Sequence, residues 1–466
     1  MLEFIGFLPH PPLIIPEVGG DEAGMIAATQ KAMTSLAAEI KTVNPDVLVL
    51  ITPHGPVFSD AVTITAAETL RGDMAQFGAP QIKLEFSLDL EAAGRVRDFS
   101  KDTPVPVALL DKPTRSRFNC SDRLDHGLFV PLYFVSRAGW QGKILPVNMA
   151  FLPYEELYDF GGILRAALDD LGRRWVLLAS GDMSHCLLPG APAPYSPKGA
   201  EFDHIIRQAV ASGDVPKILS LEKDFIEEAA ECGLRPLVMA LGALEGYEIA
   251  ASELSYEGPF GVGYFTARLQ PGKIDPSRAF SREFYRRRQE KMEKRRTAES
   301  LPVRLARESI AYFLTKGQIL DLPAEYVDLQ TGGAGVFVSL KKQGNLRGCI
   351  GTVEATQKNL GLEIIHNAVS AACRDPRFEP LQLEELQEAE ISVDVLEAPE
   401  DITGIAELDP RIYGVIVKKG SRQGLLLPNL EGIHDAAEQV EIAKQKAGLR
   451  REDNVTLSRF KVTRYT

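Results

Sequence analysis

The stretch "LEFIGFLPHPP" (residues 2–12) indicates how the chain begins to fold. Its apolar run has the length of a buried β-strand, and the prolines around His10 end that strand abruptly. The segments "DVLVLITPHG" (46–55) and "RRWVLLASGDMSH" (173–185) repeat this pattern. Between the first two strands, residues 21–43 carry apolar side chains at a helical period. The order strand, helix, strand predicts an α/β domain with a largely parallel sheet, which we assign to residues 1–272.

The composition changes after this first domain. The segment "REFYRRRQEKMEKRRTAES" (282–300) interleaves Arg and Lys with Glu, which is typical of a solvated charged helix. We therefore expect a charged helical linker over residues 273–297. Beyond it, an amphipathic helical pattern is followed by paired apolar strands, so that helices and strands are segregated. This predicts a smaller α+β domain over residues 298–466.

The bulk composition excludes several classes of protein. A formal net charge of −12 over 466 residues argues against a nucleic-acid surface, because phosphate binding needs clustered Lys and Arg. The five cysteines lack CxxC spacing, so we expect no disulfide framework and a reducing, cytoplasmic location. No stretch reaches the roughly 18 apolar residues of a membrane-spanning helix, and Glu3 with the early prolines is unlike a signal peptide. We expect no membrane partner; a homo-oligomer is one option that the sequence leaves open.

Four of the seven histidines stand in turns next to apolar runs. They are His10 in "LPHPP", His54 in "ITPHG", His126 in "LDHGLFVPL" and His185 in "SGDMSH". In an open parallel sheet, ligands bind beyond the carboxyl ends of the strands, so one rim can receive several of these side chains. Neutral imidazole is the commonest side-chain ligand of divalent transition metals, and two histidines with one carboxylate leave positions open on iron(II). We expect a metal site here rather than four separate turn residues.

The third ligand is less clear from the sequence. The segment 225–244 has Glu231 and Cys232 at a glycine turn ahead of a helix, where a polar side chain could face the same rim. The alternative is a solvated Glu231 beside a small core residue, Cys232. Asp182 in "SGDMSH" is a weaker candidate for the carboxylate.

Taken together, "PHPP", "TPHG", "DHGLFVPL", "SGDMSH" and "ECGLRP" resemble the motifs of the class III (LigB-like) extradiol ring-cleavage dioxygenases and the related Memo family, over residues 1–270. The resemblance implies a non-haem iron(II) centre held by His10, His54 and Glu231. It also implies that His185 is the acid/base histidine, that His126 contacts the substrate, and that dioxygen reacts with a small catechol-like aromatic compound. In the Memo branch a cysteine takes the position around Cys232, which is therefore an alternative ligand. The same ligands would accept zinc or manganese.

The second domain has its own motif, "NLRGCIGT" (345–352), which brings Arg347 and Cys349 together between glycines. A thiol beside a guanidinium can have a lowered pKa and act as a nucleophile, although a structural cysteine in a glycine-kinked strand fits as well. "RDPRFEPL" (374–381) adds Arg377. These motifs resemble the AMMECR domain family, for which we expect a partner- or substrate-binding role.

The fusion of the two domains resembles the AmmeMemoRadiSam system, which implies a radical S-adenosylmethionine protein as partner. The leading hypothesis from the sequence is an iron(II)-dependent extradiol-type dioxygenase. The alternative is a metal-binding Memo-like adaptor, or a component of a radical-SAM-associated system without ring-cleavage activity.

Overall fold

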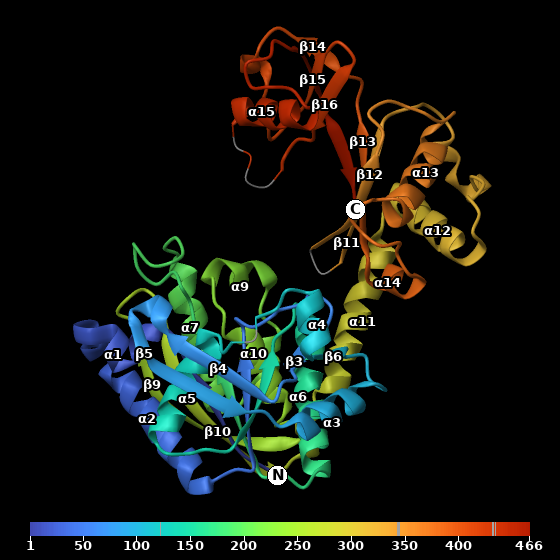
Figure 1. Cartoon of the computed structure of the whole chain (residues 1–466). Coiled ribbons are helices and arrows are strands. Elements are labelled where there is room, and N and C mark those ends of the chain that lie inside the picture. Colours follow the sequence, from blue (N-terminus) through green and yellow to red (C-terminus); the bar gives the residue numbers. More distant parts are fainter. Residues whose placement is uncertain (122, 343–344, 431–432, 434) are drawn as a thin grey trace. The chain divides into compact units, whose positions relative to one another are not determined.

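The computed structural model describes every residue except 122, 343–344, 431–432 and 434. The chain divides into two compact units, Met1–Arg287 and Arg288–Thr466 (Figure 1). The charged segment forms helix α11 (Ser281–Ala298), whose sequence runs across the boundary between the units and whose one buried side chain is Phe284. In the described part of the chain, no helix is both long enough and apolar enough to cross a membrane.

The first unit is built on an eight-stranded sheet with the order β6-β3-β7-β2-β8-β1-β10-β9. Its central strands pair in parallel, whereas β10 pairs antiparallel with β1 and β9, and β3 pairs antiparallel with β7. The strands of this unit are β1 (Leu2–Leu8), β2 (Val47–Thr52), β3 (Val62–Thr65), β6 (Val107–Leu110), β7 (Lys143–Asn148), β8 (Trp175–Ser180), β9 (Tyr247–Glu257) and β10 (Tyr264–Ile274), with a separate hairpin of β4 (Thr69–Met74) and β5 (Ala79–Ser87).

Two apolar layers sandwich this sheet, because its central strands are buried on both faces. One layer includes α2 and α5, and the other includes α3, α6, α7 and α10 (Figure 1). The helices of this unit are α1 (Pro16–Gly19), α2 (Ala27–Val43), α3 (Leu90–Ser100), α4 (Lys112–Arg117), α5 (His126–Arg137), α6 (Tyr154–Asp170), α7 (Pro197–Ser212), α8 (Val215–Leu219), α9 (Lys223–Ala229) and α10 (Leu234–Gly242).

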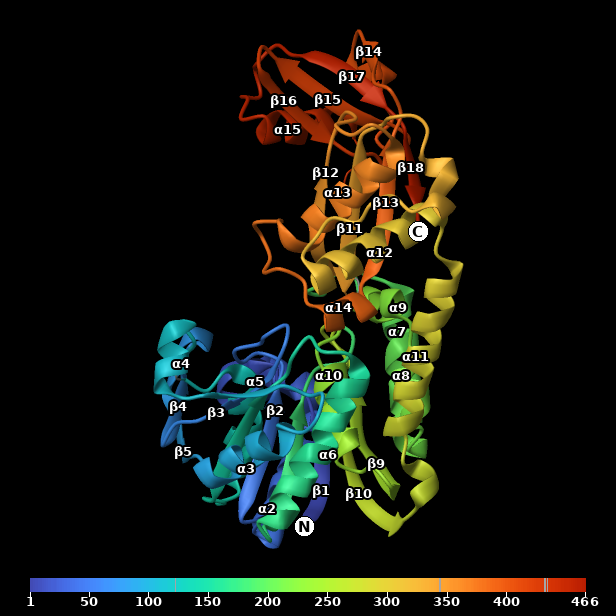
Figure 2. The ribbon, with the colours of Figure 1, turned by 90° about the vertical axis from the view of Figure 1, so that its right-hand side faces the viewer.

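The second unit holds two four-stranded antiparallel sheets, β12-β11-β13-β18 and β14-β17-β15-β16. Helices α12 and α13 pack on the first sheet (Figure 2), and α15 packs on the second. The elements are α12 (Leu301–Lys316), β11 (Val336–Lys342), β12 (Asn345–Gly351), α13 (Leu360–Cys373), α14 (Leu383–Glu388), β13 (Glu390–Leu396), β14 (Glu400–Ile402), β15 (Gly414–Lys419), β16 (Arg422–Leu426), α15 (Ala436–Lys446), β17 (Thr456–Phe460) and β18 (Val462–Tyr465).

The predicted fold classes are confirmed for both parts of the chain. The first unit has a large sheet of mostly parallel strands between helices, and the second is smaller, with antiparallel sheets and helices. In the first unit the parallel strands β1, β2 and β8 end at the same edge of the sheet, where the segments with His10, His54 and Asp182 begin.

Candidate metal centre

His10 follows β1 directly, and its surroundings fix which ring nitrogen is free. The side chain is 1 % exposed. Its Nδ1 lies 2.9 Å from Ser180 Oγ, and the Ser180 hydroxyl donates to the Gly127 carbonyl at 2.6 Å. Because a hydroxyl has one proton and a carbonyl only accepts, Ser180 Oγ must accept from His10. Nδ1 of His10 therefore carries the proton, and Nε2 is left with a lone pair, as in a metal-binding histidine.

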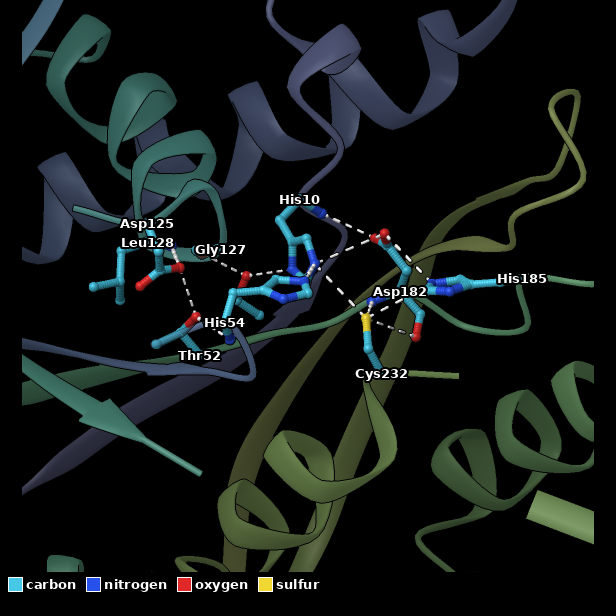
Figure 3. A network of polar contacts seen from close by, with 10 residues as sticks. His10, Thr52, His54, Asp125, Gly127, Leu128, Asp182, His185 and Cys232 are labelled. Atoms are coloured by element: carbon cyan, nitrogen blue, oxygen red, sulfur yellow. Dashed lines mark hydrogen bonds and ion pairs between the residues drawn. The ribbon is translucent and has the colours of Figure 1, made fainter. Parts of the chain in front are cut away.

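His54, after β2, directs its own Nε2 toward that lone pair. The two Nε2 atoms are 2.9 Å apart, and the rings meet edge to face (Figure 3). The backbone N–H of His54 donates to Thr52 Oγ1 at 3.1 Å, which anchors the turn. Burial, together with the neighbouring histidines, lowers the pKa of His54 to about 3 and that of His10 well below its usual range. Both rings are therefore neutral at physiological pH, the form that binds metal.

His126 is the first residue of α5, and a capping network holds it beside His54. Asp125 caps the helix by accepting from the Leu128 N–H at 3.1 Å and from Thr52 Oγ1 at 2.8 Å. The His126 ring stacks on the His54 ring with centroids 4.2 Å apart. Thr52 at the end of β2 and Asp125 at the start of α5 are therefore joined by a hydrogen bond, which keeps the imidazoles of His54 and His126 together.

Asp182 and Cys232 approach His10 from the other side. Asp182 Oδ1 accepts from the His10 backbone N–H at 3.0 Å, and Oδ2 lies 3.8 Å from His10 Nε2. Cys232 Sγ lies 3.7 Å from the same Nε2 (Figure 3). Two glycines make this approach possible, because a Cβ on Gly181 would lie 2.2 Å from the Cα of Gly233. The backbones at the end of β8 and in the turn before α10 can therefore approach closely at these two glycines.

His185 borders Asp182 and Cys232. Its Nε2 lies 3.9 Å from Asp182 Oδ2 and 3.7 Å from Cys232 Sγ. The side chain is 26 % exposed, so solvent reaches it. Burial lowers the pKa of His185, against the opposing effect of the Asp182 carboxylate. The ring is therefore neutral at pH 7 and free to accept a proton.

Glu231 lies elsewhere in this region. Its carboxylate accepts from the Leu234 backbone N–H at 2.5 Å, at the start of α10, and burial raises its pKa to about 7. The structure does not bring it into the cluster around His10 that the sequence led us to expect, because the N–H groups at the helix start hold its oxygen.

Among the residues that the structure describes, two groups of three side chains could hold a metal ion. One is His10, His54 and His126, and the other is His10, Asp182 and Cys232. His10 belongs to both. Ligand atoms 2.0–2.3 Å from one ion and about 90–110° apart are separated by about 2.8–3.8 Å. The distances from His10 Nε2 are 2.9 Å to His54 in the first group, and 3.7 Å to Cys232 and 3.8 Å to Asp182 in the second, so the donors that flank His10 in each group are spaced for a divalent transition metal.

A cavity of about 930 Å³ opens beside His54 and His126. Its walls combine aromatic side chains such as Phe58 and Phe118 with polar ones such as Gln76 and Asn148. Phe58 and Phe118 meet edge to face with centroids 5.2 Å apart. The volume is within the range of small-molecule pockets, so a small aromatic ligand would fit beside the histidines.

The three candidates in the second unit lie near one another, since Arg347 and Arg377 both lie over the Phe378 ring, but different partners hold their side chains. The Arg347 guanidinium is held by Glu385 through two hydrogen bonds of 3.1 and 3.0 Å. Arg377 instead donates from Nη2 to the Cys349 carbonyl at 3.2 Å. Cys349 and Arg377 therefore form one cluster, and the charge of Arg347 is engaged by α14.

The sequence reasoning missed the residues that support the histidines. Ser180 orients His10, while Thr52 and Asp125 join His54 to His126. Two signals were available. Ser180 and Thr52 are polar residues at the last positions of otherwise apolar strands, and Asp125 precedes a helical pattern at the position of an N-cap.

Comparison with known proteins agrees with this architecture. The family model "Catalytic LigB subunit of aromatic ring-opening dioxygenase" matches residues 5–267, and the AMMECR1 model matches residues 303–466. Protein CA_C1420 of Clostridium acetobutylicum is 38% identical over 460 residues, which is 98% of each chain. A protein of Thermotoga maritima is 48% identical over 160 residues, covering 34% of this chain and 91% of its own.

Two solved structures are also similar to parts of the chain. An uncharacterized protein, PH0010, from Pyrococcus horikoshii has 32% identity and a TM-score of 0.33, covering 35% of this chain and 88% of its own. The uncharacterized protein JW3007 from Escherichia coli has 18% identity and a TM-score of 0.39, covering 57% of this chain and 99% of its own. Since the LigB model spans more than half of the chain and the relative from Clostridium matches it from end to end, the chain belongs to the LigB family, in the two-domain form in which a LigB domain is followed by an AMMECR1 domain.

Proposed function

We propose that the first domain is a non-haem iron(II)-dependent dioxygenase of the class III extradiol type, acting on a catechol-like or related small aromatic substrate. The observation that carries this proposal is the free lone pair of His10 Nε2, which has His54 Nε2 2.9 Å away on one side and the Asp182 carboxylate 3.8 Å away on the other. Two histidines and one carboxylate are the donor set of non-haem iron(II) oxygenases.

His10 and His54 would hold the ion, and Asp182, which belongs to the other group that contains His10, would close on it as the third ligand. The free lone pair on His10 Nε2 supports this role, because the Ser180 contact leaves that atom with no proton. When bound, iron(II) would supply open positions for the two substrate oxygens and for dioxygen. The proposed third ligand is Asp182, since the Glu231 carboxylate is occupied by the start of α10.

The remaining side chains would handle the substrate and its protons. The cavity beside His54 and His126 would take the aromatic ring, with His126 against it. His185, neutral and partly open to solvent, would accept a proton from a substrate hydroxyl and later return it. This division assigns His10 and His54 to the ion, His126 to the substrate ring and His185 to proton transfer.

One observation favours a second candidate function. Cys232 Sγ lies 3.7 Å from both His10 Nε2 and His185 Nε2, so a thiolate could complete the metal site in place of the carboxylate. Such a centre would suit a metal-binding adaptor of the Memo type without ring cleavage. In either case we propose that the AMMECR1 domain binds a partner or a substrate, with a radical S-adenosylmethionine protein as the partner class.

Metal analysis of protein purified without oxygen, followed by oxygen uptake with a panel of catechols, tests the proposal. We expect iron in the wild type, loss of metal in His10→Ala, and retained metal without turnover in His185→Ala. His204→Ala is the matched control, because His204 is an exposed residue of α7 away from this cluster, and it should keep both metal and turnover. Zinc at full occupancy, or no oxygen uptake with iron loaded, would favour the adaptor instead.

A further inference from the structure

A thiol and two guanidinium groups gather in the second unit, on one face of the sheet β12-β11-β13-β18. Cys349 on β12 lies opposite Ser339 on β11. Two residues before Ser339, Phe337 lies opposite Asp394 on β13. Asp394 in turn lies opposite Arg464 on β18. Directly opposite residues of an antiparallel sheet point to the same face, as do residues two apart on one strand. Cys349, Asp394 and Arg464 therefore share a face, opposite the apolar face that packs on α12 and α13.

A buried carboxylate holds each guanidinium in place. Asp375 accepts from Nε and Nη2 of Arg377 at 2.9 and 2.6 Å, and Asp394 accepts from the same two atoms of Arg464 at 2.7 Å each. The two carboxylates are 4% and 1% exposed. The arginine side chains are 54% and 49% exposed. Within the described part of the chain, the Nη1 groups of these two arginines donate to no protein acceptor, so they remain available to a ligand.

Cys349 contacts Arg377 directly, because its carbonyl accepts from Arg377 Nη2 at 3.2 Å, and it shares the sheet face with Arg464 on β18. Its Sγ accepts from the Ser339 hydroxyl at 3.2 Å, and its backbone N–H donates to Asp375 at 2.9 Å. The pKa values of Arg377 and Arg464 are raised, chiefly by their carboxylate partners Asp375 and Asp394 and in addition by the charge of a Cys349 thiolate. The side chain of Cys349 is half-buried. The thiol thus has a hydroxyl donor on one strand and two fixed cations within electrostatic range.

We propose that Cys349, Arg377 and Arg464 form a second binding site, which captures a small ligand by its carboxylate or phosphate group and holds it beside the thiol. Arginine recognises both oxyanions through paired N–H donors. The two buried carboxylates balance the two guanidiniums, so the attraction comes from directed N–H groups rather than from net charge. Arg347, whose guanidinium is engaged by Glu385, is not part of this site.

A pair of alkylating reagents provides the test on the full-length folded protein. Iodoacetate carries a carboxylate and iodoacetamide does not, while both transfer a carbon to a thiolate with loss of iodide. The rate constants at Cys349 are measured by peptide mass spectrometry, and their ratio is compared with the ratio in urea-unfolded protein. One charge-assisted contact predicts that folding raises the iodoacetate-to-iodoacetamide ratio by about tenfold. Protection by inorganic phosphate, compared with acetate, shows which oxyanion the site prefers.

Variants decide whether the guanidiniums are responsible. Arg464→Gln should return the ratio to the unfolded value, and Arg464→Lys should retain part of the increase. Arg374→Gln removes an exposed charge close by in sequence and should leave the ratio unchanged. Should Arg464→Gln fail to fold, the double change Arg464→Gln with Asp394→Asn removes both charges of the pair. A ratio equal in folded and unfolded protein, one insensitive to these changes, or a Cys349 that neither reagent labels in the folded state would overturn the proposal.

Discussion

The hydrogen bond from His10 to Ser180 gives the sharpest test of the metal centre. Ser180→Ala removes the only oxygen that accepts from His10 Nδ1–H at 2.9 Å among the described residues. The imidazole is buried, so the proton on Nδ1 loses its partner, and the ring is released to carry its proton on Nε2 instead. That tautomer has no lone pair directed at the ion, and metal binding must first reverse it.

The size of the effect follows from this contact. Removing the partner that orients a metal-binding histidine costs about 10- to 100-fold in metal affinity. At about 1.4 kcal/mol for each factor of ten, this corresponds to about 1.4–2.8 kcal/mol. The variant also leaves the Gly127 carbonyl without the Ser180 donor, so the free energy of unfolding should fall by about 1–3 kcal/mol in addition.

Competition against a coloured chelator measures the iron(II) or zinc dissociation constant, and urea unfolding of metal-free protein measures stability separately. Ser309→Ala is the matched control, since Ser309 is a fully buried residue of α12 whose hydroxyl donates to the Leu305 carbonyl at 2.6 Å. It should leave metal affinity unchanged, because it lies in the second unit. A dissociation constant for Ser180→Ala within about threefold of the wild type would refute the reasoning, since 10-fold is the least that it requires.

Two further predictions concern the first unit. Gly181→Ala should lower the free energy of unfolding by about 1–3 kcal/mol and weaken metal binding, because its Cβ would lie 2.2 Å from Gly233 Cα. Gly94→Ala, in open space on α3, is the control and should raise the free energy of unfolding by about 0.5–1 kcal/mol in the same urea titration. Equal effects of the two changes would contradict this reasoning. Burial raises the pKa of Asp203 from 3.8 to about 6, so the folded state binds its proton more tightly than the unfolded state. Stability from this group is therefore present below pH 4 and lost as the pH rises through 6. Relative to Asp203→Asn, the wild type should lose about 2 kcal/mol of unfolding free energy between pH 4 and 7. A stability difference that does not change with pH would count against burial as the cause.

The sequence was informative wherever a short pattern determines geometry. Apolar runs that end in His10 and His54 predicted side chains at one rim, and the structure brings these two together with His126. The third donor could not be read in the same way. Glu231 and Asp182 both stand near glycines, but the start of α10 holds the Glu231 carboxylate, while the close approach of Gly181 to Gly233 accompanies the contact of Asp182 with His10. Such contacts join segments about fifty residues apart and leave no periodic signal.

Asp182 and Cys232 are not independent alternatives for the third ligand. The Asp182 N–H donates to Cys232 Sγ at 3.3 Å, and the Cys232 N–H donates to the Asp182 carbonyl at 3.4 Å. These two hydrogen bonds hold the segments of Asp182 and Cys232 together. Asp182 Oδ1 also binds the His10 backbone, which leaves Oδ2 for an ion. Asp182 therefore supports the centre in both proposed functions, at least by fixing His10, whereas Cys232 contributes a ligand in only one. Because a carboxylate suits harder ions and a thiolate softer ones, the choice of metal and the choice between oxygenase and adaptor reduce to whether Cys232 binds the ion.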